Sequence, residues 1–569
     1  MRHTRATGAA VLCLTLAVAG CSAGDSSADG SSTPGSVSSA QGSESGSSPG
    51  ATAGPSASGS PGASADPGAT ASGPASARLA IETGWGPSRR EITRARRLVS
   101  GLALRELAGQ VIVAKYDGTK APSALVNGLH LGGVIAFSDN ITGTTQIRRS
   151  NQTLQRSAAH AGRRWPVFVG VDQEGGIVER VKGDATRFPT FMTAGAADDT
   201  GLTRAAYAAS GAELVDLGFT VDFAPDGDVT SGPDDPTIGS RSAGSRPRLV
   251  ARQMNAAVDG YLSAGILPVI KHFPGHGSVP ADSHLELPVQ DKSLRQLLRS
   301  DLVPFKAGVA EGISAVMVAH IDVRAVDPGM PSSLSSKVIT GLLRNRLGFN
   351  GLVVTDALNM KGVTDRFGSA ASAVRALRAG ADVLLMPPSP RAARNGIVRA
   401  VRSGRLARAR LEQAAVRQVA ILLHQRGVQP SVRKPPGSSG AVSRKLSAAG
   451  ITVASGPCRG RLVGSGVRAV GPADAVAQFN AAASAAGLRT SSGTSLALIG
   501  YRGSPRTADI VVSMDTPYVL GRSRAGTAKI ASYGDTPGAM RALVAVLLGK
   551  AHAPGRLPVP VSGVGRTGC

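Results

Sequence analysis

Between residues 110 and 385 the chain repeats one pattern, in which a short, continuous apolar run is followed by a segment with helical periodicity. Continuous apolar runs are typical of parallel strands, which are buried on both faces when helices cover the sheet. Eight of them fit a (β/α)8 barrel, and an open doubly wound sheet is the alternative. The runs are Gln110–Ala114, Gly133–Phe137, Val167–Val171, Phe219–Ala224, Leu267–Lys271, Ala315–Ala319, Leu352–Thr355 and Asp382–Leu385.

Polar side chains follow several of these runs at the point where the predicted strand ends. Asp172 follows the third run, Lys271 and His272 close the fifth, His320 follows the sixth and Asp356 the seventh. Strand ends are often polar in any protein, but barrel enzymes carry their chemistry at the carboxyl ends of the strands. The clustering of titratable groups at equivalent ends therefore favours an active site at this edge of the sheet.

The two ends of the chain differ in composition from this central region. Residues 22 to about 80 are almost wholly Ser, Gly, Ala, Pro and Thr, which provide too little apolar surface to fold. Gln429–Gly440 is typical of a linker. Shorter α/β patterns follow it, with LVGSGVRAVG, TSLALIGY and ADIVVSM predicted as strands and PGAMRALVAVLLGKA as a helix. We therefore expect a signal peptide (1–20), a disordered tether (21–84), the barrel domain (85–428), a linker (429–442) and a smaller α/β domain (443–569).

The N-terminus has the features of a secretory signal. Arg2 and Arg5 precede an apolar run, Ala9–Ala19, that is too short to span a bilayer and ends in small residues before Cys21. This ending resembles a bacterial lipobox, which implies cleavage before Cys21 and lipidation of its sulfur. A lipoprotein on the outer face of the cell membrane is therefore expected, and an ordinary signal peptide with a chance Cys is the alternative.

The cysteines and the charge bear on compartment and partners. Once Cys13 leaves with the signal and Cys21 carries lipid, Cys458 and Cys569 are left, and we predict that they form a disulfide in an oxidising compartment. The chain has 63 basic and 38 acidic residues, a net charge of +25. Because the arginines are scattered and no basic block contains interleaved aromatic residues, we do not expect a nucleic-acid partner.

The segment KHFPGHGSVPADSH, Lys271 to His284, concentrates chemistry-bearing residues in a loop rich in Gly and Pro. Three interpretations are open. His272, His276 and His284 could bind a metal, although their spacing matches no short metal motif. Asp282 could orient His284 for acid/base chemistry, or the histidines could be purely structural. We expect neither a metal nor a cofactor.

Further segments give this loop its context. KHFPGHGSVPADSHLELP, GGVIAFSDNI, GVDQEGGIVERV, GFTVDFAPDGDV, PTIGSRSAG, GLVVTDALNMKGV, ADIVVSMDTPYVL and LLGKAHAPGRLPV all resemble segments of glycoside hydrolase family 3. The resemblance is to its bacterial β-N-acetylglucosaminidase branch of NagZ type, and it covers about residues 95 to 565. It implies a (β/α)8 barrel followed by an αβα sandwich domain.

The resemblance also implies roles for single residues. Asp356 falls at the position of the nucleophile, His284 at that of the general acid/base, and Asp282 at that of its orienting partner. Ile177 stands where the family usually has Arg, and Ala357 where a second acid is common. The sugar-binding positions are occupied by Asp172, Arg180, Arg241, Lys271 and His272.

These roles predict a retaining exo-glycosidase that removes terminal β-linked N-acetylglucosamine from peptidoglycan fragments or related glycans. An ionised Asp supplies a covalent nucleophile, and an imidazole with a pKa near neutrality exchanges the proton. A phosphorylase is an alternative, because a His does not repel phosphate as a carboxylate does. A β-glucosidase and a non-catalytic lipoprotein that binds wall sugar are the others.

Overall fold

The computed structural model describes residues 81–428, 434–565 and 567–569. The predicted signal peptide, Cys21 and nearly all of the predicted tether lie outside the described residues, as does the start of the predicted linker. None of the helices in the described ranges has the length and apolar character needed to cross a bilayer.

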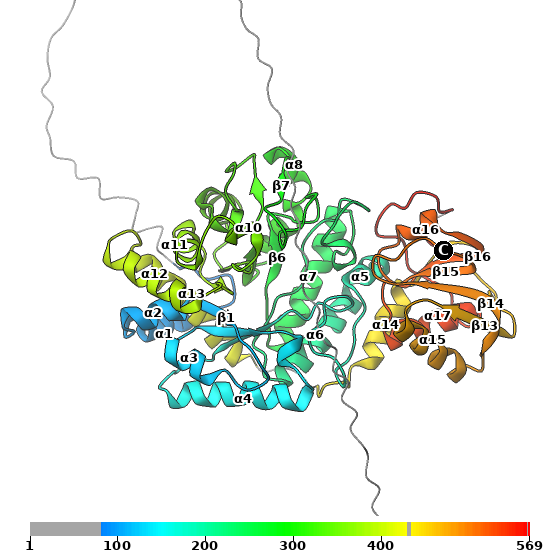
Figure 1. Cartoon of the computed structure of the whole chain (residues 1–569), viewed down its shortest axis with the longest axis horizontal. Coiled ribbons are helices and arrows are strands. Elements are labelled where there is room, and N and C mark those ends of the chain that lie inside the picture. Colours follow the sequence, from blue (N-terminus) through cyan, green and yellow to red (C-terminus); the bar gives the residue numbers. More distant parts are fainter. Residues whose placement is uncertain (1–80, 429–433, 566) are drawn as a thin grey trace, which may run out of the picture. The chain divides into compact units, whose positions relative to one another are not determined.

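A curled parallel sheet forms the larger part of the fold (Figure 1). Six of its strands pair in the order β11 (Leu384–Leu385), β1 (Ile112–Lys115), β2 (Gly133–Ala136), β3 (Phe168–Val171), β4 (Val221–Asp222) and β5 (Leu267–Pro268). Three more pair in the order β10 (Leu352–Thr355), β8 (Ala315–Val318) and β6 (Ile270–Phe273). All of these pairings are parallel.

The six-stranded and the three-stranded arrays meet at two places, one between β4/β5 and β6 and the other between β10 and the residue before β11. Strands β5 and β6 are separated only by Val269, and single bridges join Asp226 to Lys271 and Val354 to Val383. Each of the eight predicted apolar runs overlaps a strand of this sheet. The predicted α/β class with a parallel sheet is therefore confirmed, whereas closure into a complete (β/α)8 barrel stays a prediction.

Helices cover the sheet and bury one large apolar cluster, built mainly from Ala, Val, Leu and Ile. Their ends follow local chemistry: α7 has Pro247 at its first position and ends at Gly265, whose φ of 85° suits a residue without a Cβ. The helices are α1 (Arg89–Ser100), α2 (Leu104–Gln110), α3 (Ser123–Leu129), α4 (Thr144–His160), α5 (Phe191–Ala197), α6 (Thr200–Asp216), α7 (Pro247–Ala264), α8 (Leu294–Arg299), α9 (Leu302–Ala310), η5 (Lys337–Arg346), α10 (Lys361–Thr364), α11 (Ser369–Ala379), α12 (Pro390–Arg402) and α13 (Arg408–Gly427).

A second sheet follows in the C-terminal part, in the order β12 (Thr452–Ser455), β16 (Arg524–Ala531), β15 (Thr507–Ser513), β14 (Arg489–Ile499) and β13 (Gly466–Val470). Only β12 is antiparallel to its neighbour. Its helices are α14 (Gly440–Gly450), α15 (Ala473–Ala485), α16 (Val519–Arg522) and α17 (Pro537–Leu547). Cys458 and Cys569 form a disulfide in this domain, the pairing that we expected.

The structure corrects two predicted boundaries. Ile81, assigned to the tether, is buried with Trp85 in the main apolar cluster, because both side chains are large and apolar. Helix α14 begins at Gly440, so the last three residues of the predicted linker are helical. Strands β12 and β16 were not predicted from the sequence, whereas β13, β14, β15 and α17 match predicted segments.

Candidate active site

A cavity of about 400 Å³ lies at the carboxyl ends of the parallel strands. Asp356 and His284 line this cavity, and Asp282 is hydrogen-bonded to His284 beside it. The five predicted sugar-binding residues also line it, namely Asp172, Arg180, Arg241, Lys271 and His272. The structure therefore brings together residues that are up to 184 positions apart in the sequence, from Asp172 to Asp356.

Lys271, on β6, is the centre of a buried ionic cluster. Its ammonium group donates to Asp172 at 2.7 Å and lies 2.6 Å from Glu174, and the side chain is 2% exposed. Arg241, which ends the short helix η3 (Gly239–Arg241), binds both oxygens of Glu174 at 2.9 Å. Such a bidentate contact fixes the orientation of the guanidinium plane as well as the position of its positive charge.

The charges of this cluster stabilise one another. Burial acts to raise the pKa of Glu174, but the positive charges of Arg241 and Lys271 outweigh it and hold that pKa below its usual range. Burial acts to lower the pKa of Lys271, and the carboxylates of Asp172 and Glu174 raise it above its usual range. The cluster therefore presents fixed charges and donors to a bound ligand, with little reorganisation required.

His272 is held between an acid and a guanidinium. Its Nδ1 lies 2.7 Å from Asp228 Oδ2, and its Nε2 lies 3.3 Å from Arg241. Burial and the neighbouring charge of Arg241 lower the pKa of His272 to about 4, so the ring is neutral at pH 7. In that state Nδ1–H donates to Asp228, and Nε2 accepts from Arg241.

Asp226, Asp228 and His272 offer three ligand atoms within 4.8 Å of one another, an arrangement that could hold a metal ion. Arg241 lies 3.7 Å from Asp226 Oδ2, however, and supplies positive charge at that position. We therefore interpret the two carboxylates as the group that orients His272 and Arg241. Among the described residues, His272, His276 and His284 do not form a metal-binding group, because His276 and His284 bind Ser283 and Asp282 instead.

Asp356 follows β10 and is half-buried at the cavity. One carboxylate oxygen accepts the backbone N–H of Ala357 at 2.7 Å. Burial acts to raise the pKa of Asp356, but His320 and His272 together with this N–H lower it below its usual range. The carboxylate is therefore ionised and available to attack an electrophile.

His320 does not line the cavity but lies behind Asp356. Its Nδ1 is 2.7 Å from the Ser333 hydroxyl and its Nε2 is 3.0 Å from the carbonyl oxygen of Ala357. Burial lowers its pKa, so the ring is neutral, and its Nε2–H donates to that carbonyl. His320 thus positions the segment that carries the nucleophile candidate.

The Asp282–His284 pair lies at the surface of the same cavity. His284 Nδ1 is 2.7 Å from Asp282 Oδ1, and the same oxygen accepts the backbone N–H of His284 at 2.9 Å. The His284 side chain is 64% exposed. Burial acts to raise the pKa of Asp282, but the hydrogen bonds from His284 lower it, so the acid is ionised and fixes Nδ1 as the protonated nitrogen.

His276 connects this exposed pair to the buried cluster. Its backbone N–H donates to Asp228 Oδ1 at 2.6 Å, and its Nε2 lies 2.9 Å from the Ser283 hydroxyl. The carbonyl oxygen of Ser283 also accepts the backbone N–H of Gly362 at 3.2 Å. The loop is therefore held before the Asp282–His284 pair, at His276, and between its two members, at Ser283.

Arg180 lies at a different wall of the cavity. Its guanidinium stacks over the Phe137 ring at 5.4 Å, and its buried Nε has no hydrogen-bond partner within the described ranges. A buried donor without a partner is costly, so a ligand that accepts this hydrogen bond gains affinity. The geometry fits a role in holding a polar ligand.

Phe137, Glu174, Asp226 and Asp228 are among the residues of the cavity and its support that were not assigned roles from the sequence. Each lies in a segment quoted above, and the three acids directly follow β3 or β4. Acids after strands were the signal that identified Asp172 and Asp356. The same signal could have found these three as well.

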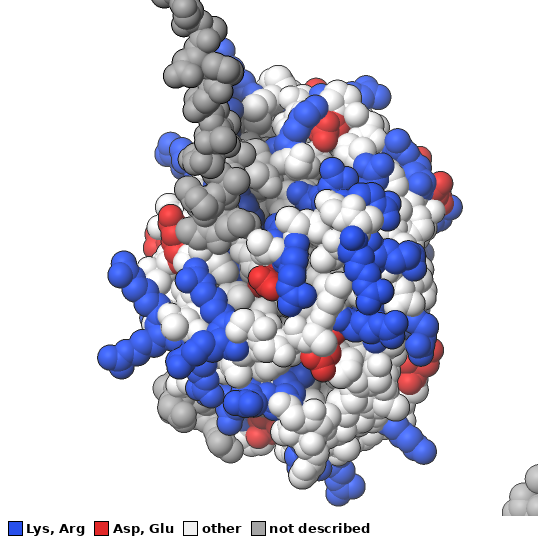
Figure 2. Space-filling model, turned by 90° about the vertical axis from the view of Figure 1, so that its left-hand side faces the viewer, with Lys and Arg blue, Asp and Glu red and all other residues white. Residues whose placement is uncertain are grey.

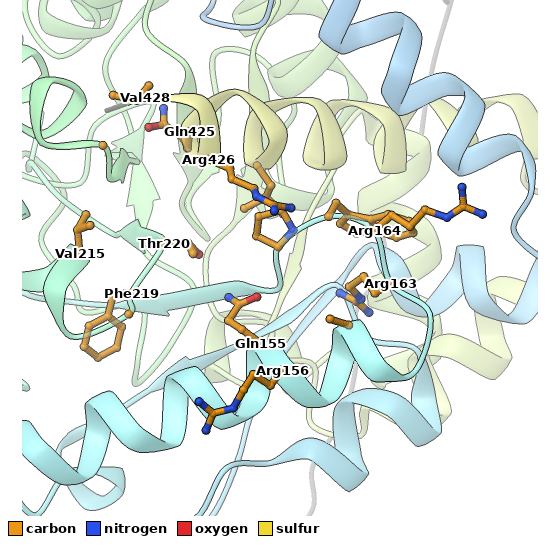
Figure 3. Close-up of a pocket in the computed structure, with 16 residues that line it drawn as sticks. Gln155, Arg156, Arg163, Arg164, Val215, Phe219, Thr220, Gln425, Arg426 and Val428 are labelled. Atoms are coloured by element: carbon orange, nitrogen blue, oxygen red, sulfur yellow. The ribbon is translucent and has the colours of Figure 1, made fainter. Parts of the chain in front are cut away.

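A larger cavity of about 550 Å³ lies near the amino ends of the strands (Figure 3). Pro166, Phe219 and Gly265, which line it, come shortly before β3, β4 and β5. Its wall is mainly apolar, with arginines such as Arg163 and Arg426, and no acid or histidine lines it. Because it offers no proton-transfer pair or carboxylate nucleophile, we assign the active site to the smaller cavity.

Several known proteins are similar to much of this chain in sequence and in fold. Residues 103–421 match the model of the "Glycosyl hydrolase family 3 N terminal domain". Beta-hexosaminidase A of Pseudoalteromonas piscicida is 37% identical over 282 residues, which is 47% of each chain, so the match spans about half the length of that relative. Beta-hexosaminidase LpqI of Mycobacterium tuberculosis is 34% identical over 331 residues, 56% of this chain and 82% of that protein.

The solved structure of a glycoside hydrolase family 3 beta-N-acetylglucosaminidase from Paenibacillus superposes with a TM-score of 0.73. It is 28% identical and is matched over 81% of this chain and 99% of its own. That coverage is larger than residues 103–421.

Proposed function

Because the chain belongs to glycosyl hydrolase family 3, we propose that it is a retaining exo-glycosidase that releases terminal β-linked N-acetylglucosamine. The observation that supports this most directly is that an ionised Asp356, a buried cationic cluster and the Asp282–His284 pair face one cavity. Peptidoglycan fragments and related amino-sugar glycans are the proposed substrates. No cofactor takes part in the proposed reaction.

In the first step the terminal sugar is bound by Lys271, Arg241 and their acidic partners, which fix its hydroxyl groups. Asp356 attacks the anomeric carbon and forms a glycosyl ester as the bond to the leaving oxygen breaks. His284 gives its Nε2 proton to that oxygen, while Asp282 stabilises the charge that the ring carries before the transfer.

In the second step a water molecule enters from the side that the leaving group vacated. His284, now neutral, accepts a proton from the water as the water oxygen bonds to the anomeric carbon. The ester bond to Asp356 breaks, and the carboxylate is regenerated. The two inversions give net retention of configuration at that carbon.

Release of 4-nitrophenol from 4-nitrophenyl N-acetyl-β-glucosaminide tests this function. The wild-type chain is expected to release it, and Asp356→Ala to reduce kcat on the order of 10³-fold or more. Asp365→Ala, in an exposed ion pair with Lys361, is the matched control and keeps its activity. Full activity in Asp356→Ala would contradict the assignment.

The same assay separates the other activities that the family allows. Faster turnover of the β-glucoside than of the N-acetylglucosaminide would make the chain a β-glucosidase. A sugar 1-phosphate that forms only when phosphate is added would make it a phosphorylase. Binding of the amino sugar without turnover would make it a wall-sugar-binding protein.

Three further features belong to the proposal. The parallel strands form one closed (β/α)8 barrel, which is supported by the bridges Val354–Val383 and Asp226–Lys271. The chain is divided as 85–428 and 443–569, with a signal peptide and a tether before them. It is a lipoprotein anchored through Cys21 on the outer face of the membrane, which the lipobox-like sequence supports.

A further inference from the structure

Helix α1, the first helix of the described fold, carries far more positive than negative charge. In α1, five exposed arginines occur within nine residues: Arg89, Arg90, Arg94, Arg96 and Arg97. Within the described residues, none of their guanidinium groups has an ion pair or a hydrogen bond to another side chain. Like charges this close repel one another, and the repulsion is relieved when an anionic partner binds.

Neighbouring elements extend this charge. Helix α1 contacts α13 through Glu91 and His424 at 3.2 Å, and Arg408 of α13 reaches the carbonyl oxygen of Leu102 before α2 at 3.5 Å. Helix α2 packs in turn on α12. We define the basic face as the exposed arginines of α1, α2 and α12, together with Arg405 of the turn after α12: Arg89, Arg90, Arg94, Arg96, Arg97, Arg105, Arg391, Arg399, Arg402 and Arg405.

The acids on the same helices are already engaged. Glu91 accepts hydrogen bonds from Ser88 and lies next to His424, Glu106 accepts the backbone N–H of Ala103 at 2.9 Å, and Glu412 pairs with Arg408 at 2.7 Å. Figure 2 shows the outcome, a surface on which Lys and Arg far outnumber Asp and Glu. Burial and the nearby charges of Arg105 and Arg391 lower the pKa of Arg394 beneath this surface, consistent with a local excess of positive charge.

We propose that the basic face binds a membrane surface that contains anionic phospholipids. The arginines are spread over helices side by side, and no residue of α1, α2 or α12 lines either cavity described above, so the face fits a plane of headgroups better than a single buried anion. No large apolar side chain is exposed on these helices, so contact is electrostatic and without insertion.

The place of the face in the chain favours a membrane over a soluble polyanion. The N-terminal segment, with the predicted lipidation site at Cys21, leads into the fold at Ile81, eight residues before α1 begins. An anchor on that segment keeps the basic face at a high effective concentration near the bilayer. The active-site cavity contains no residue of the face. The inference goes beyond the proposed activity and does not require it.

The test uses unlipidated protein from residue 22 onward, which retains all three apolar clusters of the fold. Co-sedimentation is measured with vesicles of phosphatidylcholine alone and with about 30% phosphatidylglycerol. We expect binding only to the anionic vesicles, and loss of that binding as salt rises from 50 to 500 mM, because the contact is electrostatic.

Two variants with equal charge loss locate the surface. Arg90→Gln/Arg94→Gln/Arg97→Gln is expected to weaken vesicle binding on the order of 100-fold. Arg468→Gln/Arg524→Gln/Arg541→Gln removes three exposed arginines of the C-terminal domain and keeps most of the binding. Both variants keep wild-type glycosidase activity, which shows that they fold and separates this test from that of the proposed function.

Three results would overturn the proposal. The first is equal binding of the wild-type chain to neutral and anionic vesicles. The second is an equal loss of vesicle binding in the two triple variants. The third is that the wild-type chain binds long-chain polyphosphate but does not bind vesicles. The last result would assign the face to a soluble phosphate polymer instead.

Discussion

The groups that face the active-site cavity belong to two regions that differ in how they are held. The Lys271 cluster is buried, and each of its charges has a partner within 3 Å. The Asp282–His284 pair lies on a loop, and the His284 side chain is 64% exposed. Sugar binding requires fixed charges, whereas proton transfer to a leaving group and then from water requires access from outside. The buried cluster is therefore suited to sugar binding, and the exposed Asp282–His284 pair to proton transfer.

The largest effect is expected in the buried region. Lys271→Met leaves Asp172 and Glu174 without their shared cation, which should lower the free energy of unfolding by about 3–5 kcal/mol. It should also reduce kcat/KM on the order of 100-fold. Urea unfolding followed by circular dichroism, together with steady-state kinetics, measures both.

The control for this change is Lys337→Met. Lys337 pairs with Asp327 at 2.9 Å, but its side chain is 65% exposed, so the loss should stay below about 1 kcal/mol. Equal losses of stability in the two variants would mean that the buried cluster is no more important than a surface ion pair.

A smaller effect is expected from the C-terminal domain. The carboxylate of Asp515 accepts a hydrogen bond from Ser240, the residue before Arg241. Asp515→Ala should therefore raise KM about fivefold, equal to about 1 kcal/mol, with kcat nearly unchanged, because it loosens a binding group and leaves the nucleophile untouched.

Asp509→Ala provides the matched comparison in the same domain, since the Asp509 carboxylate accepts hydrogen bonds from Ser495, which lies outside the active site. It should leave KM and kcat unchanged. A fall in kcat with constant KM in Asp515→Ala would show that this contact does not act through Arg241.

The last effect concerns pH and is absent at neutral pH. Burial lowers the pKa of His276 from 6.5 to about 4, so the unfolded chain takes up the proton first as pH falls. His276 therefore costs no stability above about pH 6.5 and reduces stability progressively between pH 6.5 and 4. His276→Gln should flatten part of this decline in urea unfolding, whereas His160→Gln on the exposed side of α4 should not. An unchanged slope in His276→Gln would show that this ring is not buried in its neutral form.

The sequence predicted the reacting groups better than the groups that support them. Asp356 and His284 lie in short segments with dense local signals, and the structure brings them to one cavity. The sequence shows that Glu174 follows β3, but its pairing with Arg241 and Lys271, which lie much later in the chain, leaves no local pattern. For the same reason β12 was missed, since its partner β16 lies about 75 residues further along the chain.

Domain boundaries were predicted less accurately, because composition changes gradually while burial does not. Ile81 follows a run of Ser, Gly and Ala, and only its contact with the apolar cluster places it in the folded domain.

The most direct test of the divided roles is the behaviour of His284→Ala with two leaving groups. Cleavage of a 2,4-dinitrophenyl N-acetylglucosaminide needs no proton donor, so we expect a rapid first turnover and an ester on Asp356 that mass spectrometry detects. Azide, which needs no general base, should restore turnover and give the β-glycosyl azide, while a chitobiose substrate should stay nearly inert. Equal rate losses with both leaving groups, with no ester and no effect of azide, would contradict the claim that His284 moves the proton.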